Sequence, residues 1–459
     1  MLDIQKIIKD RARENVALHQ NINPQFAKVL KTIGFDKSYV KALGVSLFDA
    51  DNIEYYDFLA GYGVFGLGRN HPKMKKLFRD FLDLDTPSLV QMDAPLLSGL
   101  LAERLVQIFG HNIRDTVYFT NSGTESIESA IKFVRGATGR ERIINLEHAF
   151  HGLTTGSLSV NGNAEFKDGF GTLLPSDTLP LNNLNLLEEK LKTKQYAAFI
   201  FEPVQGKGVF VPDQTFLQNA ITLCKKYGTL TIADEVQSGL GRTGKWLACE
   251  HFDIEPDIVC LSKALSGGIC PVGAVVYKRE IYNKVFSRMD RCVVHSSTFG
   301  QNDYAMFCGL AALSILEEEQ LIQNAAKMGK SLLAKLNALK EKHDWIKEVR
   351  GKGLMIGIEF QKPSGIKKKI AWELVHKMDK GLFGELIVMS LLSRHRILTQ
   401  VSGHHQDIVK MLPPFIINET HVNHFVESLD DVLTNCDKVT GPIFTMGKNL
   451  ARHIVNQNT

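Results

Sequence analysis

Two residues with reactive side chains each follow a short apolar segment of the chain. Asp234 comes directly after residues 230–233, and Lys263 comes directly after residues 258–262. Apolar runs of this length that end at turn residues are typical of buried strands in a parallel sheet. The carboxyl ends of such strands share one edge, and ligands bind there in open α/β sheets. We therefore expect the acid and the amine to face one site, beside the glycine-rich turns that follow them.

This pair of side chains is suited to pyridoxal phosphate (PLP). A lysine amine forms a Schiff base with the cofactor's aldehyde, and a carboxylate keeps the pyridine nitrogen protonated so that the ring accepts carbanion charge. A lysine is usually a solvated surface residue. After a buried strand, however, its charge is costly unless its pKa is lowered or its amine is covalently bound.

Residues 121–125, with the sequence Asn-Ser-Gly-Thr-Glu, lie between a predicted strand and a predicted helix. Ser122 and Glu125 fit a capping box, in which the two side chains accept hydrogen bonds from backbone N–H groups at the helix start. The remaining free N–H groups and the small side chains make this helix start a natural phosphate site. A helix cap without any ligand is the alternative.

Three further residues follow predicted strands. Phe150 could stack on a planar cofactor, and Glu202 could face a charged group of the substrate. For His151, a structural hydrogen bond is the simpler interpretation. Core packing of Phe150 and a surface ion pair of Glu202 stay open as alternatives.

The elements that would position these residues alternate along the chain from about residue 116. Strand-like segments are separated by stretches with helical periodicity, which is typical of a doubly wound, mostly parallel sheet in an α/β protein. The six candidate strands are residues 116–119, 142–145, 198–201, 230–233, 258–262 and 274–277. A long helical stretch from Tyr304 to about residue 339 is expected after them.

These patterns divide the chain into three parts. Residues 1–50 have a mostly helical pattern, residues 51–335 would form a large PLP-binding domain, and residues 336–459 would form a smaller α+β domain and a tail. We expect the N-terminal helical segment to pack with the small domain.

Composition excludes several other classes of protein. A net charge of +4 over 459 residues is too small and too dispersed to indicate a nucleic-acid partner. No apolar segment is long enough to cross a bilayer, so no membrane partner is expected. The seven cysteines lack metal-type spacing and are interpreted as reduced thiols of a cytoplasmic protein. His404 and His405 have no third ligand beside them, so a loop is expected there rather than a metal site.

These segments, in this order, resemble the class III aminotransferases, which are PLP enzymes of fold type I. The resemblance extends over about residues 57–414. It is most specific in residues 234–265, which contain Asp-Glu-Val-Gln at the start and Ser-Lys-Ala-Leu at the end, and which are most similar to the ornithine and putrescine branch. The family implies a large PLP-binding domain and a smaller α+β domain.

The resemblance also implies roles for individual residues around the cofactor ring. Lys263 would hold PLP and act in catalysis, Asp234 would pair with the pyridine nitrogen, and Gln237 would lie near the ring's phenolic oxygen. Phe150 would stack on the ring, where many relatives have tyrosine, with His151 beside it.

The phosphate of the cofactor would be held at the helix start and by a second subunit. Ser122, Gly123 and Thr124 would bind it from the same chain. Thr298 would reach the phosphate of the neighbouring subunit, so the resemblance implies a homodimer with its active sites at the subunit interface.

One position departs from the family pattern. Many relatives that act on amino acids have an arginine just before the Pro-Pro of the small domain, and the aligned residue here is Lys410. Lysine is a point charge and cannot grip a carboxylate with two parallel hydrogen bonds. The substrate carboxylate would then be met by Lys410 itself or by another base such as Arg394 or Arg396. The apolar residues 386–389 favour a roomier substrate pocket, although core packing explains them equally well.

The expected reaction is a PLP-dependent transamination. An amino group would pass from a primary amine, or from the terminal amine of an amino acid resembling ornithine, to a 2-oxo acid by a ping-pong mechanism. Two enzymatic alternatives are amination of long-chain aldehydes or ketones, and an aminomutase or decarboxylase reaction that consumes no separate acceptor. The intact Lys263, Asp234 and Gln237 disfavour a non-catalytic binding protein.

Overall fold

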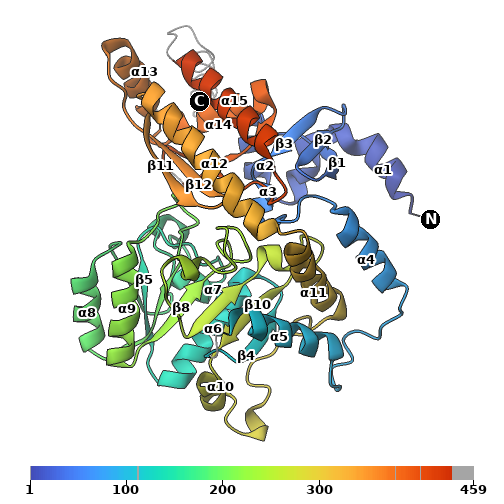
Figure 1. Cartoon of the computed structure of the whole chain (residues 1–459), viewed down its shortest axis with the longest axis vertical. Coiled ribbons are helices and arrows are strands. Elements are labelled where there is room, and N and C mark those ends of the chain that lie inside the picture. Colours follow the sequence, from blue (N-terminus) through green and yellow to red (C-terminus); the bar gives the residue numbers. More distant parts are fainter. Residues whose placement is uncertain (1, 111–112, 378, 404, 437–459) are drawn as a thin grey trace. The chain divides into compact units, whose positions relative to one another are not determined.

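The computed structural model describes residues 2–110, 113–377, 379–403 and 405–436 (Figure 1). The chain forms two compact units. The central unit contains Gly61–Leu67 and His71–Ala326, and the terminal unit contains the described parts of Met1–Ala60, Gly68–Asn70 and Lys327–Thr459. The domain limits expected near residues 50 and 335 stay a prediction, because compact packing alone does not define a domain that folds by itself.

The central unit is built around a seven-stranded sheet in the order β4-β10-β9-β8-β7-β5-β6. Its strands are β4 (Thr116–Thr120), β5 (Arg142–Leu146), β6 (Ser176–Leu179), β7 (Tyr196–Phe201), β8 (Leu230–Asp234), β9 (Ile258–Leu261) and β10 (Gly273–Tyr277). The five strands from β9 to β6 are parallel, whereas β10 is antiparallel to both β4 and β9. The predicted mostly parallel α/β sheet is therefore confirmed, and all six candidate strands are present.

Helices cover this sheet, and some of them end at a glycine. The α-helices that lie within the central unit are α4 (Pro72–Leu82), α5 (Leu96–Phe109), α6 (Gly123–Thr138), α7 (Thr155–Ser159), α8 (Leu184–Lys192), α9 (Gln214–Tyr227), α10 (Arg279–Val285) and α11 (Asp303–Glu318). Short 3-10 helices are η2 (Ala164–Phe166), η3 (Ala248–His251), η4 (Lys263–Ser266) and η5 (Met289–Arg291). Gly139 and Gly228 end α6 and α9 with φ values of +68° and +65°, a conformation that glycine adopts without strain.

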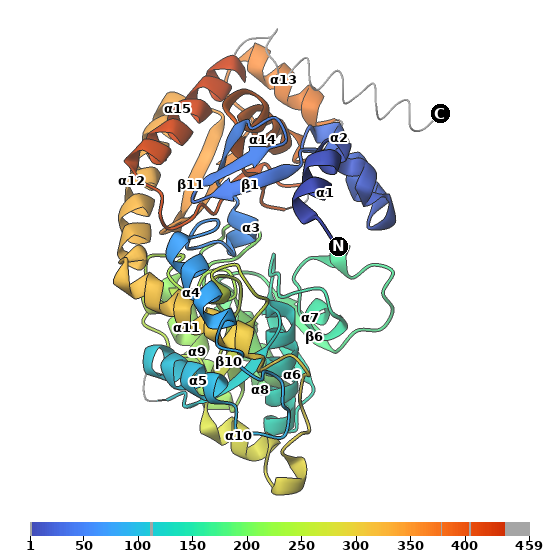
Figure 2. The ribbon, with the colours of Figure 1, turned by 90° about the vertical axis from the view of Figure 1, so that its right-hand side faces the viewer.

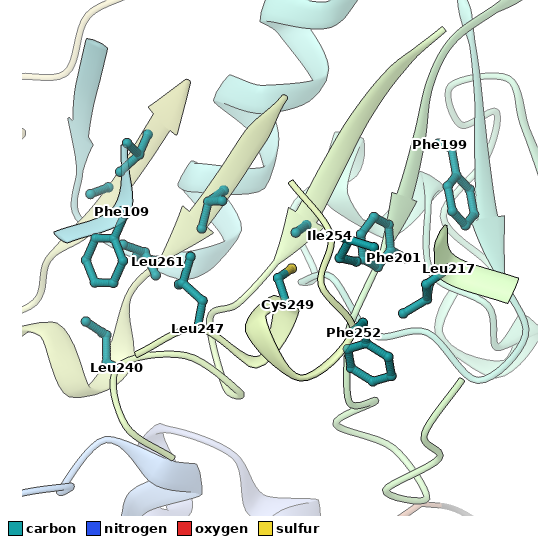
Figure 3. Packing of buried hydrophobic residues seen from close by; sticks show 14 of the residues in the cluster. Phe109, Phe199, Phe201, Leu217, Leu240, Leu247, Cys249, Phe252, Ile254 and Leu261 are labelled. Carbon is teal, nitrogen blue, oxygen red and sulfur yellow. The ribbon is translucent and has the colours of Figure 1, made fainter. Parts of the chain in front are cut away.

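Alternate side chains of the strands point to opposite faces of the sheet. In β8, Ile232 packs with residues of α6 and α10, whereas Ala233 packs with residues of α5, α8 and α9. Figure 3 shows part of the second cluster, where Phe199 and Phe201 of β7 lie near Leu217 of α9. Burying each such side chain contributes roughly 1.5–3 kcal/mol. Apolar packing on both faces therefore fixes the positions of the carboxyl ends of the strands.

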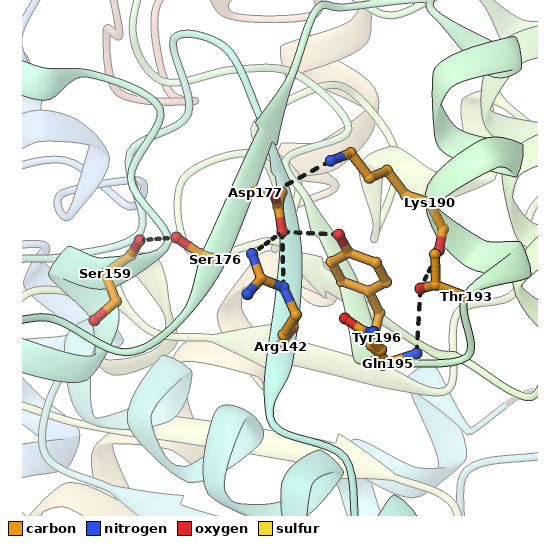
Figure 4. A network of polar contacts seen from close by, with 8 residues as sticks. All are labelled: Arg142, Ser159, Ser176, Asp177, Lys190, Thr193, Gln195 and Tyr196. Atoms are coloured by element: carbon orange, nitrogen blue, oxygen red, sulfur yellow. Dashed lines mark hydrogen bonds and ion pairs between the residues drawn. The ribbon is translucent and has the colours of Figure 1, made fainter.

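Strand β6, at one edge of the sheet, was not predicted from the sequence. Its residues are mostly polar, so they lack the apolar run by which the other strands are recognised. Asp177 of β6 accepts hydrogen bonds from Arg142 Nη2 at 2.6 Å and Tyr196 OH at 2.8 Å (Figure 4). Although burial opposes the shift, these donors from β5 and β7 lower the pKa of Asp177. A charged network thus ties the edge strand to its neighbours.

The predicted helical stretch from Tyr304 to about residue 339 is present, but it is interrupted once. The structure has two helices there, α11 and α12 (Leu321–Lys342), and Gln320 between them has a φ of +51°. A left-handed residue cannot continue a right-handed helix. The polar residues at the break also fit the helical periodicity, which is why the sequence pattern runs through it.

The terminal unit contains two four-stranded sheets. One has the order β1 (Tyr39–Leu43), β2 (Ser46–Asp49), β3 (Glu54–Asp57) and β13 (Ile397–Leu398). The other has the order β11 (Ile346–Lys352), β12 (Met355–Phe360), β15 (Ile408–Met411) and β14 (Gln400–Val401). Its helical elements are α1 (Ile4–Arg11), η1 (Ala12–Asn21), α2 (Pro24–Ile33), α13 (Ile366–His376), α14 (Leu382–His395) and α15 (Glu419–Cys436), while the short α3 (Ala60–Gly63) and α12 contain residues of both units.

The N-terminal part is less helical than its pattern indicated. Residues 39–49 form the hairpin of β1 and β2 instead of continuing the helices. Gly44 lies in its turn with a φ of +59°, which permits the chain to reverse. Tyr39 packs edge to face on Tyr55 of β3 at 5.5 Å between ring centroids, so aromatic packing stabilises the strands.

The apolar residues 386–389 belong to the interior of the terminal unit. They lie in α14 (Figure 2), and this helix packs against α15, β13 and β15. Leu386 and Ile387 are completely buried, and Phe383 of the same helix stacks on Trp345 at 4.9 Å. These contacts support core packing as the explanation of this segment. In the part of the chain that the structure describes, no helix combines the length and apolar character needed to span a membrane.

Candidate active site

The ends of β8 and β9 bring Asp234 and Lys263 to one cavity. The two strands pair in parallel, with Asp234 opposite Cys260, so both end at the same edge of the sheet. The cavity has a volume of about 280 Å³. It is lined by Gly123, Thr124, Phe150, His151, Gly152, Glu202, Gly206, Asp234, Val236, Gln237, Ser262 and Lys263. Residues from five separate segments of the central unit thus converge there.

Asp234 is held by two hydrogen bonds. It is 5% exposed, and its Oδ1 accepts from the backbone N–H of Val236 at 3.0 Å. His151 Nδ1 lies 2.8 Å from the other carboxylate oxygen, while His151 Nε2 is buried and has no hydrogen-bond partner among the described residues. Asn161 fixes the backbone of this histidine by accepting from its N–H at 2.6 Å. The carboxylate is therefore oriented, and one buried ring nitrogen beside it is left for a ligand.

Lys263 begins η4 directly after β9. Its φ of +44° is unusual for a residue with a side chain, and such strain is found mostly at functional sites. Burial lowers the pKa of the Lys263 amine, and the nearby Asp234 and Glu202 partly oppose that shift. Within the described residues the amine makes no hydrogen bond or ion pair. It is therefore a nucleophile without a competing partner.

Glu202 lies in the same cavity, directly after β7. It is 4% exposed, so the surface ion pair considered for it is wrong. Its two carboxylate oxygens accept from the N–H groups of Phe150 at 2.9 Å and Gly206 at 2.6 Å. Burial raises the pKa of Glu202 to about 7, with His151 and the two hydrogen bonds acting in the opposite direction and Asp234 in the same one.

The start of α6 forms one wall of the cavity. Ser122 is its N-cap and accepts from the N–H of Glu125 at 3.3 Å, but the Glu125 carboxylate accepts from the N–H of Asn121 rather than from Ser122. The capping box is therefore only half formed. A Cβ at Gly123 would lie 2.6 Å from Val236, so this position requires glycine. The first N–H groups of a helix have no acceptor within it, and those of Gly123 and Thr124 border the cavity.

Two more residues expected at the site also line the cavity. Gln237 donates from Nε2 to the backbone oxygen of Tyr62 at 3.0 Å. Phe150 packs edge to face on Phe166, with 5.6 Å between the ring centroids. Both therefore have defined positions, and Phe150 is not simply a core residue because it borders the cavity.

Other expected site residues lie elsewhere. Thr298 is exposed in the loop before α11, where its backbone oxygen accepts from Gln91, and it does not line the cavity of its own chain. Lys410 is buried in β15 of the terminal unit. Arg394 and Arg396 also belong to the terminal unit, and Arg394 pairs with Asp431 at 3.3 Å. His404 of the expected loop pair lies outside the described residues.

Sequence reasoning missed three residues that shape the site. Asn161 positions His151, and Glu128 of α6 accepts from the N–H groups of Gly156 and Ser157 at the start of α7. The third, Lys207, lies beside the cavity-lining Gly206. No local motif marks these residues, because their partners are distant in the sequence.

A larger surface hollow of about 720 Å³ lies at the opposite ends of the strands, where β8 and β9 begin. Its charged groups are partly neutralised within the protein, since Lys278 pairs with Asp257 at 2.6 Å. Asp257 also accepts from the N–H and hydroxyl of Thr231. These contacts are structural, and the hollow lacks the convergence of reactive groups seen at the other edge.

Comparison with known sequences identifies the family. The model of the family Aminotransferase class-III matches residues 33–433. Aminotransferase PigE from a Serratia species is 32% identical, and the alignment covers 95% of this chain but 54% of PigE, so the chain spans about half the length of that relative. Acetylornithine aminotransferase from Methanocaldococcus jannaschii is 36% identical over 87% of this chain and 94% of its own length.

Solved structures of similar proteins agree with this result. Ornithine aminotransferase from Toxoplasma gondii, which was found with partial occupancy of PLP at its active site, has a TM-score of 0.80 and 27% identity, over 95% of this chain and all of its own. A PLP-bound amine transaminase from an uncultivated Pseudomonas species has a TM-score of 0.76 and 28% identity, over 88% of this chain and 96% of its own. The chain therefore belongs to the class III aminotransferases and is a PLP-dependent transaminase of fold type I.

Proposed function

We propose that this protein moves an amino group from a primary amine, or from the terminal amine of an amino acid resembling ornithine, to a 2-oxo acid by a ping-pong mechanism. The observation that carries the proposal is the free amine of Lys263, with its lowered pKa, beside an Asp234 carboxylate held by His151. The names of the aligned ornithine and acetylornithine aminotransferases support donors of this kind.

The residues of the cavity fit PLP. Gly123, where a Cβ would collide with Val236, lines the cavity at the start of α6, and the buried Nε2 of His151 lacks a partner within the described protein. When bound, PLP supplies an aldehyde that bonds amines and a ring that accepts electron pairs. Lys263 would hold the aldehyde, and Ser122, Gly123 and Thr124 would hold the phosphate.

Four side chains would surround the ring. Asp234 would face the pyridine nitrogen, Gln237 would lie near the phenolic oxygen, and Phe150 would stack on the ring with His151 beside it. Each of the four lines the cavity, which supports these assignments. The buried Asp234 is suited to this task because water does not screen its charge.

In the reaction, Lys263 Nζ would move a proton. Its lowered pKa increases the neutral fraction of the amine at neutral pH, so that Nζ, once an incoming amine has released it, could accept and hold a proton from the donor carbon. Asp234 would stabilise positive charge at the ring nitrogen throughout. Glu202, with a pKa of about 7, would adjust the charge of the cavity near the working pH.

The active form is proposed to be a homodimer with shared sites. Thr298 does not line the cavity of its own chain, and its exposed position supports a contact with the phosphate site of a second subunit. Apolar side chains around it are also exposed, including Phe299 and Val293. Burial of such residues against a second copy would remove apolar surface from water.

A second candidate function is amination of long-chain aldehydes or ketones. The apolar residues 386–389 do not support this function, because they are core residues. Leu153, however, is 58% exposed and directly follows the cavity-lining Gly152. An acceptor with a hydrocarbon chain could cover this side chain. Activity that rises with the length of the aldehyde would favour this function over the first.

The experiment that tests the proposed function follows the half-reaction. Purified holoenzyme is mixed with putrescine, ornithine, 4-aminobutyrate or a long-chain primary amine, one at a time and without an acceptor. Loss of the cofactor's visible absorbance with one equivalent of product per site is expected for a true donor in a ping-pong mechanism. Steady turnover without any acceptor would instead indicate an aminomutase or decarboxylase.

A further inference from the structure

Lys207 lies in the loop that follows β7, next to a residue that lines the cavity. Its neighbour Gly206 lines the cavity, and its own side chain is half-buried. The Nζ atom lies 5.5 Å from the ring centroid of Phe150 and 5.1 Å from that of Phe166. Because Phe150 also lines the cavity, the ammonium group lies against a residue of the cavity wall.

The charge of Lys207 is not neutralised by a direct partner. Within the described residues its Nζ makes no hydrogen bond and no ion pair, and its recorded contacts are those with the two phenylalanine rings. Burial lowers the pKa of this amine, while Glu165 and Glu202 act in the opposite direction without touching it. A half-buried cation in this situation has lost water and gained only cation–π contacts.

The cavity-lining carboxylate that influences Lys207 is already occupied. Glu202 uses one oxygen for the N–H of Phe150 and the other for the N–H of Gly206, so the backbone holds both oxygens. Arg114, a buried cation of the central unit, is by contrast bonded: it donates to the backbone oxygens of Phe109 and Pro256. Lys207 is thus a cation near the site, and its ammonium group can still donate hydrogen bonds.

We propose that Lys207 recognises the carboxylate of the acceptor and makes the site prefer oxo acids to neutral aldehydes. This inference rests on the proposed function and adds the residue that selects its second substrate. A carboxylate would provide the charged hydrogen bond that Lys207 lacks, and the two phenylalanine rings would strengthen that bond by excluding water. The proposal places the residue that selects the acceptor in the central unit, where the cavity lies. Lys410 is then not required for this selection.

The test compares two acceptors and two substitutions. Lys207→Met removes the charge but keeps the length and apolar stem of the side chain, and Lys207→Arg keeps the charge. Lys192→Met is the matched control, because Lys192 is an exposed lysine on α8 whose ammonium group pairs with Glu188 at 3.8 Å. For each holoenzyme, kcat/KM is measured with 2-oxoglutarate and with hexanal, after the cofactor has been aminated by an excess of donor that is then removed.

Loss of a charge-assisted hydrogen bond predicts that Lys207→Met lowers the ratio of kcat/KM for 2-oxoglutarate over hexanal by about tenfold or more. Lys207→Arg should restore most of the ratio, and Lys192→Met should leave it unchanged. An unchanged ratio in Lys207→Met, or an equal fall in Lys192→Met, would overturn the proposal.

Binding of glutarate, a dicarboxylate that cannot react, gives a readout without turnover. Calorimetric titration should show a Kd raised by about tenfold in Lys207→Met relative to the unsubstituted holoenzyme. Equal affinity in both proteins would refute the role of Lys207 even if no amine donor were found. Failure of the donor half-reaction with weaker glutarate binding in Lys207→Met would instead refute the proposed function alone.

Discussion

His151 Nδ1 and Asp234 Oδ2 lie 2.8 Å apart in the interior of the central unit. The two residues are 83 positions apart in the sequence, and their side chains are both nearly inaccessible to water. A proton on Nδ1 would be donated to the carboxylate and would leave Nε2 as an acceptor. This contact fixes the orientation of the Asp234 carboxylate at the cavity. The proposed chemistry depends on the negative charge of that carboxylate.

Asp234→Asn should abolish most activity while the protein still folds. The amide can accept from the N–H of Val236, as Asp234 does, but it carries no charge to keep the pyridine nitrogen protonated. We expect kcat to fall by at least about 10³-fold, which corresponds to ~4 kcal/mol of barrier. A fall of less than about tenfold, or ~1.4 kcal/mol, would contradict the role of this carboxylate.

A matched control for this substitution is Asp257→Asn. Asp257 is also hydrogen-bonded within the central unit, but it lies before β9, at the opposite edge of the sheet. Its loss should reduce the thermal midpoint without a comparable loss of kcat. Similar losses of kcat in both variants would mean that folding, and not the site charge, explains the effect.

Gly123→Ala should weaken the binding of PLP. The added Cβ would lie 2.6 Å from Val236 and would push the start of α6 or the strand end out of position. The affinity for PLP, measured by equilibrium dialysis, should fall by at least about tenfold, or ~1.4 kcal/mol. Gly136→Ala is the control, because its Cβ would meet only Val285 at an ordinary 3.5 Å, within the same helix. Equal PLP affinity in all three proteins would refute the phosphate role of residue 123.

The buried Glu235 should make stability depend on pH. Burial raises the pKa of its carboxyl from the ordinary 4.5 to about 7 in the folded protein. Below pH 4.5 both the folded and the unfolded chain hold the proton. Between pH 4.5 and 7 only the folded chain retains it, so the stability contributed by this group is lost as pH rises through that window.

Glu235→Gln cannot titrate and isolates this effect. The difference in unfolding free energy between the original protein and the variant should decrease from pH 4.5 to pH 7 by on the order of 3 kcal/mol. The variant itself loses stability at all pH values, because Ser238 and the N–H of Cys249 both donate to the carboxylate. Denaturant unfolding at a series of pH values measures the difference. A difference that stays constant or grows with pH would show that the carboxyl is ionised in the fold.

The sequence predicted those parts of the fold that local physical chemistry determines. Strands β7, β8 and β9 are buried on both faces, so each must be a continuous apolar run, and runs of this kind are visible in one sequence. The position of Asp234 and Lys263 at one edge follows from the parallel pairing of their strands. The polar β6 escaped prediction because its stability comes from Asp177 and its charged neighbours rather than from apolar residues.

The rest of the site depends on contacts between distant segments. Nothing near Lys207 in the sequence indicates that its amine lies over Phe150 and Phe166. Likewise, the burial of Glu202 and its two backbone donors appear only when the loops after β5 and β7 are brought together. Local patterns therefore identified the reactive groups, whereas the structure supplied the residues that orient them and the cation that could select a substrate.

The most direct test of the account is to find the residue that bonds PLP. The purified holoenzyme is treated with borohydride, which makes the bond between a lysine amine and the cofactor permanent, and its peptides are examined by mass spectrometry. The account predicts one pyridoxyl phosphate group per chain, on the peptide that contains Lys263, and none in Lys263→Ala. A group on another lysine of the original protein, or no group after saturation with PLP, would contradict it.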